Sequence, residues 1–279
     1  MIRGQNIICI SSIDWDFIWQ GHQEIMSRFA AHGNRVLFIE NTGIRAPTWR
    51  DLPRLRSRLQ NWRRGTRGFR QVAENLYVYA PVLLPFPYSR GARWINRLFI
   101  EQDLRRWLEI MEFRAPVIWT FLPTALARDL TKTLRATLVI YYCIDDFAAS
   151  SRQAAKIKRS EVEMFRTADL VFVTSSQLER RARQYSQAVH LFPFGVNLER
   201  FEAVRTSETV RDPEDLAAIS RPRLGYVGGI HRWVDLELLR EVAVRYPKFQ
   251  LVLVGPIQTD VEPLRGLPNV HLLGSKPHA

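Results

Sequence analysis

The sequence predicts an α/β protein with two doubly wound, Rossmann-like parallel-sheet domains, the second of them incomplete. Short apolar runs of strand length alternate with longer segments of helical period. These runs are continuous rather than alternating, as expected for strands buried on both faces of a parallel sheet. The same alternation starts again after a polar stretch at residues 198–222, which indicates a second domain.

The first series predicts one parallel sheet wrapped by helices, in a domain of residues 1–197. We expect strands at 7–10, 36–39, 76–79, 117–121, 138–142, 170–174 and 189–192. We expect helices at about 21–32, 91–112, 124–134, 152–167 and 176–186.

The second series is shorter. Residues 198–222 are polar and charged, and we expect them to connect the two domains. Residues 223–279 then carry predicted strands at 224–227, 251–254 and 270–273, with one clear helix at about 235–246. One helix would leave a face of this sheet uncovered, so we expect a partial domain.

Composition limits the classes of function. The chain has a net charge of +12, which favours an anionic partner such as a nucleic acid, a membrane surface or a phosphorylated ligand. The start of the chain lacks the features of a signal peptide, and Cys9 and Cys143 lie in apolar runs as expected for buried thiols, so the cytoplasm is the expected compartment. The six histidines show no metal-ligand spacing, and we expect no metal site and no cofactor.

The end of the first strand offers a candidate acceptor site. Asp14, Trp15, Asp16 and Trp19 follow that strand, at the edge of an open α/β sheet where ligands bind. Tryptophan faces with polar groups would suit a sugar or a lipid head group. A capped helix start with hydrophobic packing would explain the same residues. No Gly-x-Gly-x-x-Gly fingerprint is present, which argues against a nicotinamide dehydrogenase.

Paired carboxylates follow another buried strand. Asp145 and Asp146 lie just beyond the predicted strand at 138–142, after Cys143 and Ile144. Two neighbouring carboxylates tend to raise the pKa of one of them, and a raised pKa suits a general base that takes a proton from a hydroxyl. Helix capping and structural hydrogen bonding are the alternative roles.

A strongly basic segment lies between residues 45 and 70, with nine arginines and one acidic residue. Leucines at three- and four-residue intervals and Trp62 form an apolar stripe along it, the profile of a helix on a membrane surface. Each arginine near anionic lipid contributes about 1 kcal/mol. A solvated face on a helix packed against its own domain would look the same, and no nucleic-acid-binding motif accompanies the charge. The residues expected at the membrane are Arg54, Arg56, Arg58, Trp62, Arg63 and Arg64.

The second series opens with a candidate phosphate site. Gly228 and Gly229 follow its first strand, and His231 and Arg232 precede the next helix. Glycines let a backbone approach a ligand closely, and a helix start with an arginine favours a diphosphate. Gly255 repeats the strand-then-glycine pattern after the next strand.

These segments together resemble bacterial glycosyltransferases of the GT-B fold, the group 1 or family 4-like enzymes of exopolysaccharide and teichuronic-acid assembly. The resemblance covers nearly the whole chain. It is carried by segments 23–40, 168–175, 192–197, 225–235, 251–255 and 269–274, in the order and spacing of that group.

The resemblance implies transfer of a hexosyl-type sugar from a nucleotide diphosphate donor to a hydroxyl acceptor, expected to be a lipid-linked glycan. It places the donor against the second domain and the acceptor against the first, at the inner face of the membrane. Arg232 falls where relatives often carry a Lys that touches the diphosphate, and Gly229 falls where many carry an Arg. Asp145 and Asp146 fall where some relatives place a base, although retaining members need none.

Length is the main departure from the group. The Glu-x7-Glu stretch that relatives carry further along is missing, so we expect these 279 residues to be an inactive N-terminal fragment. The alternative is a noncatalytic, membrane-associated protein that binds lipid or glycan.

Overall fold

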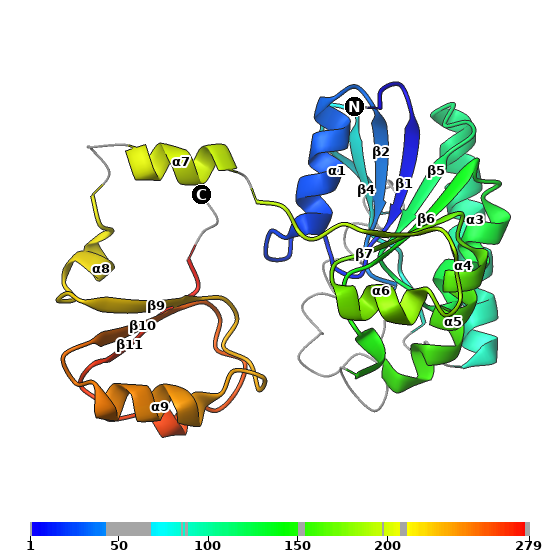
Figure 1. Cartoon of the computed structure of the whole chain (residues 1–279). Helices are drawn as coiled ribbons and strands as arrows, with labels where there is room; N and C mark the ends of the chain where they lie inside the picture. Colours follow the sequence, from blue (N-terminus) through cyan, green and yellow to red (C-terminus); the bar gives the residue numbers. More distant parts are fainter. Residues whose placement is uncertain are drawn as a thin grey trace. The chain divides into compact units, whose positions relative to one another are not determined.

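The computed structural model describes residues 2–42, 68–84, 86, 89–149, 154–196, 198–206 and 211–276. The chain divides into two compact units, Met1–Gly195 and Val196–Ala279, each with its own sheet (Figure 1). Both sheets are built on parallel pairs, with one antiparallel exception in the first. The predicted α/β class with two parallel-sheet domains is therefore confirmed.

The first unit holds an eight-stranded sheet in the order β3-β4-β2-β1-β5-β6-β7-β8. The strands are β1 (Asn6–Ile10), β2 (Arg35–Ile39), β3 (Phe69–Ala73), β4 (Leu76–Tyr79), β5 (Val117–Thr120), β6 (Leu138–Cys143), β7 (Leu170–Val173) and β8 (Val189–Leu191). The helices are α1 (Gly21–Ala31), α3 (Arg90–Ile110), α4 (Ala125–Thr133), α5 (Lys158–Thr167) and α6 (Ser176–Ala182), with short 3-10 turns η3 (Phe147–Ala149) and η4 (Ala154–Ile157).

Two hydrophobic layers cover the faces of this sheet (Figure 1). One layer packs α1 on a sheet face through Met26 and Ala30. The other packs α3, α4, α5 and α6 on the opposite face, with Ile100, Met164 and Leu178 among its fully or largely buried residues. The strands alternate between the two layers, which is why their sequences read as unbroken apolar runs. Both cysteines are buried and free.

Strand β3 differs from the expectation for its segment. It pairs antiparallel with β4, and Arg70, which the sequence pattern counted in a basic helix, lies on it. The two strands are joined at Asn75, whose φ of 58° is a conformation that asparagine tolerates in tight turns. The edge strand is half-exposed and polar, so it lacks the continuous apolar run that revealed the other strands.

The second unit holds a three-stranded parallel sheet in the order β11-β10-β9. Its elements are α7 (Leu198–Thr206), α8 (Glu214–Ala217), β9 (Arg223–Val227), α9 (Leu236–Arg245), β10 (Gln250–Val254), η5 (Glu262–Leu264) and β11 (Val270–Gly274). A small core of Ile230, Leu251, Leu253, Val261 and Leu264 packs beneath α9 and η5. The described part of the segment 198–222 contains two helices and no strand.

Candidate functional site

The carboxyl edge of the first sheet gathers the predicted acceptor and catalytic residues. Strand order reverses between β1 and β5, and the loops that follow β1, β2, β5 and β6 all leave the sheet at that edge. Such a switch point is where open α/β sheets bind ligands.

The two predicted tryptophans lie together after β1. The Trp15 ring meets Trp19 edge-on at 5.7 Å and Phe38 at 5.0 Å between ring centroids. The Trp19 indole donates to the Glu24 carboxylate at 2.9 Å. Both rings are half-buried, so each packs against the protein with one part and presents another part at the edge.

An arginine on β3 pairs with an acidic residue of the loop that follows β1. Asp14 is half-buried, whereas Asp16 is exposed and pairs with Arg70 at 2.6 Å. Arg70 also lies 3.7 Å from Glu40, a buried carboxylate that accepts the Trp15 backbone N–H at 3.2 Å. The Arg70 side chain therefore links the loop after β1 to the ends of β2 and β3. No pattern in the sequence pointed to this contact.

The two predicted catalytic carboxylates have different partners. The Asp145 carboxylate accepts the backbone N–H of Asp146 at 2.8 Å, just before η3. The Asp146 carboxylate pairs instead with Arg181 of α6, at 2.8 Å. Both side chains are exposed, so the strand end offers Asp146 to solvent while Arg181 holds it in place.

Behind Asp146 lies a buried carboxylate that sequence reasoning missed. Glu161 of α5 is fully buried, pairs with Arg181 and accepts the Tyr141 hydroxyl at 3.1 Å. Burial raises the pKa of Glu161, although Arg181 and Tyr141 oppose that rise. Burial also raises the pKa of Cys143 to about 12, with the charge of Glu161 adding to it. A signal did exist, because Glu161 shares the buried face of α5 with Met164 and Phe165 at three- and four-residue spacing.

Arg181 is the shared partner of the exposed and the buried carboxylate. Partial burial would lower the pKa of Arg181, but the two carboxylates outweigh it and the net pKa is raised. The guanidinium is therefore held charged, and it couples the position of Asp146 to the interior of the domain.

A buried histidine also lies at the carboxyl edge of the first sheet. His22, in the first turn of α1, bonds through Nε2 to the Ser12 hydroxyl at 3.0 Å, and its ring lies tilted against Phe121 with 4.0 Å between centroids. Burial lowers the pKa of His22 to about 4, so its ring is neutral at physiological pH. Its Nδ1 has no hydrogen-bond partner among the described residues. Sequence reasoning weighed His22 only as a metal ligand and missed its place at this edge.

The predicted donor residues gather at the carboxyl edge of the second sheet. Gly228 and Gly255, at the ends of β9 and β10, have φ of 159° and 147° and lie backbone against backbone. A Cβ on Gly255 would fall 1.9 Å from the Gly228 carbonyl oxygen, so only glycine fits there. The carbonyl of Gly229 accepts the Tyr226 hydroxyl at 3.0 Å, which fixes the turn.

Beyond the glycines, cationic and aromatic side chains approach the start of α9. His231 stacks on Trp233 with 3.5 Å between ring centroids, and its Nδ1 is buried without a described partner. Arg232 is exposed and lines a shallow cavity of about 450 Å³ with residues 233–237 and Thr259. The Asp235 carboxylate already accepts the Leu238 N–H at 2.9 Å. Phosphate would thus rely on the glycine turn and Arg232 rather than on the first turn of α9.

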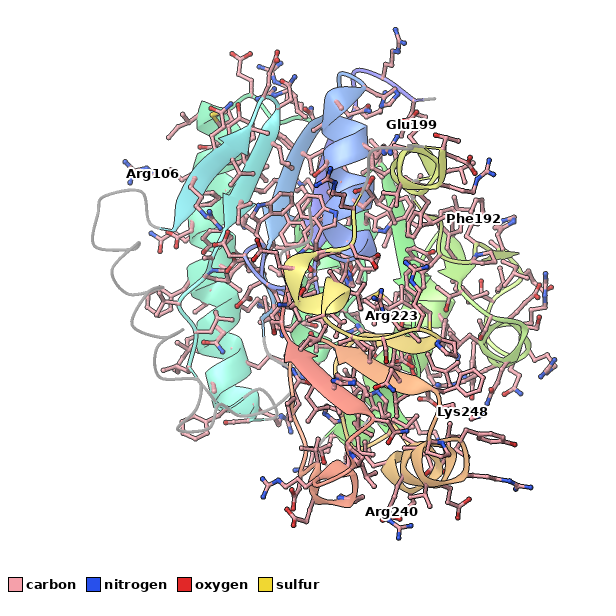
Figure 2. The ribbon with its side chains drawn as sticks, turned by 90° about the vertical axis from the view of Figure 1, so that its left-hand side faces the viewer. Arg106, Phe192, Glu199, Arg223, Arg240 and Lys248 are labelled. Carbon is pink, nitrogen blue, oxygen red and sulfur yellow. The ribbon has the colours of Figure 1, made fainter. Side chains whose placement is uncertain are left out.

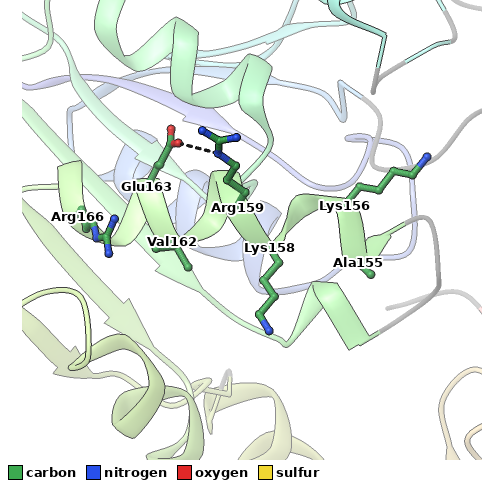
Figure 3. A pocket seen from close by; sticks show the side chains of 7 residues that line it. All are labelled: Ala155, Lys156, Lys158, Arg159, Val162, Glu163 and Arg166. Carbon is green, nitrogen blue, oxygen red and sulfur yellow. Dashed lines mark ion pairs between the residues drawn. The ribbon is translucent and has the colours of Figure 1, made fainter.

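A second shallow cavity lies on the surface of η4 and α5 (Figure 3). Its volume is about 580 Å³, and it is lined by Ala155, Lys156, Lys158, Arg159, Val162, Glu163 and Arg166. Glu163 is engaged by Arg159 at 3.6 Å and by Arg128, so part of the basic charge is already neutralised. No sequence motif predicted this surface, and it contains none of the predicted site residues.

Some predictions fall outside the described part of the chain. Arg54, Arg56, Arg58, Trp62, Arg63 and Arg64 all lie there, so the membrane helix stays a prediction. Among the described residues, no His, Cys, Asp and Glu side chains gather in threes as a metal ion would need, and no helix is long and apolar enough to cross a membrane. The absence of a cofactor stays a prediction as well.

Comparison with known proteins identifies the fold. The structure of Anabaena Alr3699/HepE in complex with UDP and glucose aligns with 98% of this chain, and the alignment spans 70% of the HepE chain. The TM-score is 0.59 and the sequence identity is 12%. This chain also matches the α,α-trehalose 6-phosphate synthase of Burkholderia multivorans over 99% of its own length and 73% of that chain, with a TM-score of 0.53 and 10% identity. The chain has the GT-B fold.

A curated sequence is also similar to this GT-B chain. TuaH of Bacillus subtilis (strain 168), named as a glycosyltransferase of teichuronic acid biosynthesis, is 29% identical over 149 residues. The match spans 47% of this chain and 37% of the relative's length. No family model matches. The expected resemblance to GT-B glycosyltransferases is confirmed.

Proposed function

We propose that this chain carries the acceptor-side and donor-binding parts of a glycosyltransferase. The enzyme would move a hexosyl-type sugar from a nucleotide diphosphate donor to a hydroxyl of a lipid-linked or glycan acceptor, in cell-surface polysaccharide biosynthesis. The GT-B fold and the likeness to TuaH support the reaction class. The HepE structure was solved with UDP and glucose, which supports a nucleotide-sugar donor.

The observation that carries the proposal is the glycine contact of the second sheet. Gly228 and Gly255 bring two strand ends within backbone contact, where a side chain on Gly255 is excluded. The N–H groups of Gly228 and Gly255 already donate to the Val254 and Gly274 carbonyls at 2.9 and 2.8 Å, so this contact fixes the turn on which the exposed Arg232 lies. An exposed arginine held on such a fixed turn favours a diphosphate.

Asp146 is the group we propose to act on the acceptor. In the reaction, an acceptor hydroxyl oxygen bonds to the anomeric carbon, the bond from that carbon to the diphosphate oxygen breaks, and the hydroxyl loses its proton. A carboxylate held at the edge of the sheet can orient the hydroxyl or accept the proton. Arg181 fixes Asp146 at 2.8 Å, so the carboxylate is positioned before the acceptor arrives.

We further propose that the protein is peripheral at the cytoplasmic face of the membrane. The described residues stop at Thr42 and resume at Gly68, and most of the basic segment lies between these two points in the sequence. Both points lie at the carboxyl edge of the first sheet, because β2 ends there and the antiparallel β3 begins there. A basic helix in this connection would lie near the proposed acceptor site, where a lipid-linked acceptor is needed.

Titration of the 279-residue chain with UDP, followed by ligand-observed NMR, tests the donor site. We expect weak binding that Arg232→Gln lowers about tenfold, the effect of one charge-assisted hydrogen bond. Arg240→Gln is the matched control, because Arg240 lies on the exposed face of α9 (Figure 2). Equal weakening by the two variants, or no UDP binding at all, would refute the proposal.

A further inference from the structure

One surface of the first unit combines exposed apolar side chains with arginines, and neither proposed binding site uses it. Trp94 and Phe99 of α3 are 58% and 61% exposed, although both are large and apolar. Leu98 is also exposed, one helical turn after Trp94. The segment before α3 adds the exposed side chains of Leu84 and Phe86. We call these five residues the α3 surface.

The α3 surface is formed by the first half of α3 and the segment that precedes it. Asn96, on the buried side of α3, accepts the Leu84 N–H at 2.8 Å and donates to the Leu84 carbonyl at 3.1 Å. These two bonds fix the segment before α3 against the helix, within one turn of Trp94 and Phe99. On α3 itself, Trp94 and Leu98 lie one turn apart on the same exposed face, and Phe99 follows Leu98 directly. A contiguous exposed apolar surface on a protein marks a contact with a partner or a membrane.

The charges around this surface point to an anionic partner. No Asp or Glu occurs in residues 81–100, whereas Arg90, Arg93 and Arg97 do. Arg93 pairs with Asp129 and Arg97 with Glu101, but Arg90 has no ion pair among the described residues. Further along α3, the exposed Arg106 points outward from the sheet (Figure 2). Tryptophan, phenylalanine and leucine flanked by arginine are the side chains that enter the interface of an anionic bilayer.

The topology places the α3 surface at the carboxyl edge of the sheet. Helix α3 follows β4 and leads into β5, which runs parallel to its neighbours, so α3 begins at the carboxyl edge and ends at the opposite edge. Trp94, Leu98 and Phe99 lie in its first half, nearer the carboxyl edge. The proposed acceptor residues Trp15 and Asp146 lie at the same edge.

We propose that the α3 surface inserts into the interface of an anionic lipid bilayer. Its apolar side chains enter the boundary between head groups and acyl chains, while Arg90 contacts lipid phosphates. The carboxyl edge of the sheet then faces the membrane, so a lipid-linked hydroxyl can reach Asp146 without leaving the bilayer. This orientation rests on the proposed function, whereas the insertion itself does not. It uses described residues only and is independent of the basic segment at 43–67.

Vesicle co-sedimentation tests the proposal. The triple variant Trp94→Gln, Leu98→Gln, Phe99→Gln should lower partitioning onto phosphatidylglycerol–phosphatidylcholine vesicles by at least about tenfold. The reason is that three large apolar side chains are no longer transferred from water into the bilayer on binding. Ile110→Gln is the matched control on the same helix, since Ile110 is 71% exposed but lies at its other end, and this variant should bind as the natural sequence does. Binding by the triple variant that equals the natural sequence overturns the proposal, and so does an absence of vesicle binding by the natural sequence.

Two further measurements distinguish insertion into lipid from association between copies of the chain. Brominated lipids should quench the tryptophan fluorescence of the natural sequence more than that of Trp94→Phe, because Trp94 is the ring that enters the bilayer. Equal quenching overturns the proposal, as does light scattering that shows the α3 surface joining two copies of the chain.

A variant of the basic segment and a measurement of UDP binding complete the comparison. The variant with Arg54, Arg56, Arg58, Arg63 and Arg64 changed to Gln should keep residual binding that depends on Trp94; if it binds no vesicles, the α3 surface is not a binding surface. UDP binding should be unchanged in the triple variant, so failure of this proposal and failure of the donor site give different results.

Discussion

Replacing Arg181 should show how much free energy it costs to keep the Glu161 carboxylate buried behind the proposed acceptor site. In Arg181→Met, Glu161 keeps its full burial and its bond from Tyr141 but loses its ion pair. Breaking a buried pair by removing one partner costs about 3–5 kcal/mol. Protonation limits that cost, because at about 1.4 kcal/mol per pH unit, neutralising a carboxyl of ordinary pKa 4.5 at pH 7 costs about 3.5 kcal/mol. We therefore expect the free energy of unfolding to fall by about 3 kcal/mol at pH 7.

The pH dependence is the sharper part of this prediction. A carboxyl whose pKa is raised in the folded state binds its proton more tightly there than in the unfolded chain. The deficit of Arg181→Met should therefore shrink as the pH falls toward 4.5, where the unfolded carboxyl also becomes neutral. Glu161→Gln keeps a side chain of the same shape without the charge, so Arg181→Met should cost less in that background than in the natural sequence.

Urea unfolding followed by tryptophan fluorescence measures this effect. Seven of the eight tryptophans lie in residues 1–195, so the signal reports the first unit, and urea leaves the ion pair unscreened. The midpoint is read between pH 5 and pH 8 for the natural sequence, both single variants and the double variant. A loss at pH 7 below about 0.5 kcal/mol, or one that does not change with pH, would refute the reasoning that Glu161 is a buried charge held by Arg181.

Three other predictions follow from the sites. Burial lowers the pKa of His22 to about 4, so as the pH falls the unfolded chain binds a proton at this histidine before the folded chain does, and the free energy of unfolding should fall below pH 6.5. His22→Leu should flatten that part of the plot of urea midpoint against pH, and an unchanged slope would contradict the burial of a neutral ring. Gly255→Ala should destabilise the second unit by about 1–3 kcal/mol, read as faster hydrogen exchange in β10, whereas Gly225→Ala, with no atom near its added Cβ, should not; similar exchange in both would contradict the tight backbone contact. In an enzyme that contains this chain and turns over donor, Asp146→Asn should lower kcat by about a hundredfold or more with little change in UDP affinity, and equal losses in both would point to a structural role.

The order and class of the elements could be predicted from the amino-acid sequence. Continuous apolar runs indicated the parallel strands, and three- to four-residue periodicity indicated α1, α3, α4 and α9 with ends close to those observed. The same pattern placed Asp146 and Gly228 at strand ends, because polar or glycine residues directly follow the runs. These properties are local, because a few neighbouring residues are enough to show that a strand is buried on both faces and where it ends.

Which side chains meet could be learned from the folded chain alone. Glu161 and Arg181 lie on separate helices, and Arg181 reaches both Glu161 and Asp146 because α5 and α6 pack on the same face of the sheet. Arg70 looked like one more charge of a basic helix, yet the β3–β4 hairpin carries it to Asp16. Pattern within a segment tells which face is buried but not which neighbour that face will contact, because the neighbour is chosen by the packing of elements distant in sequence.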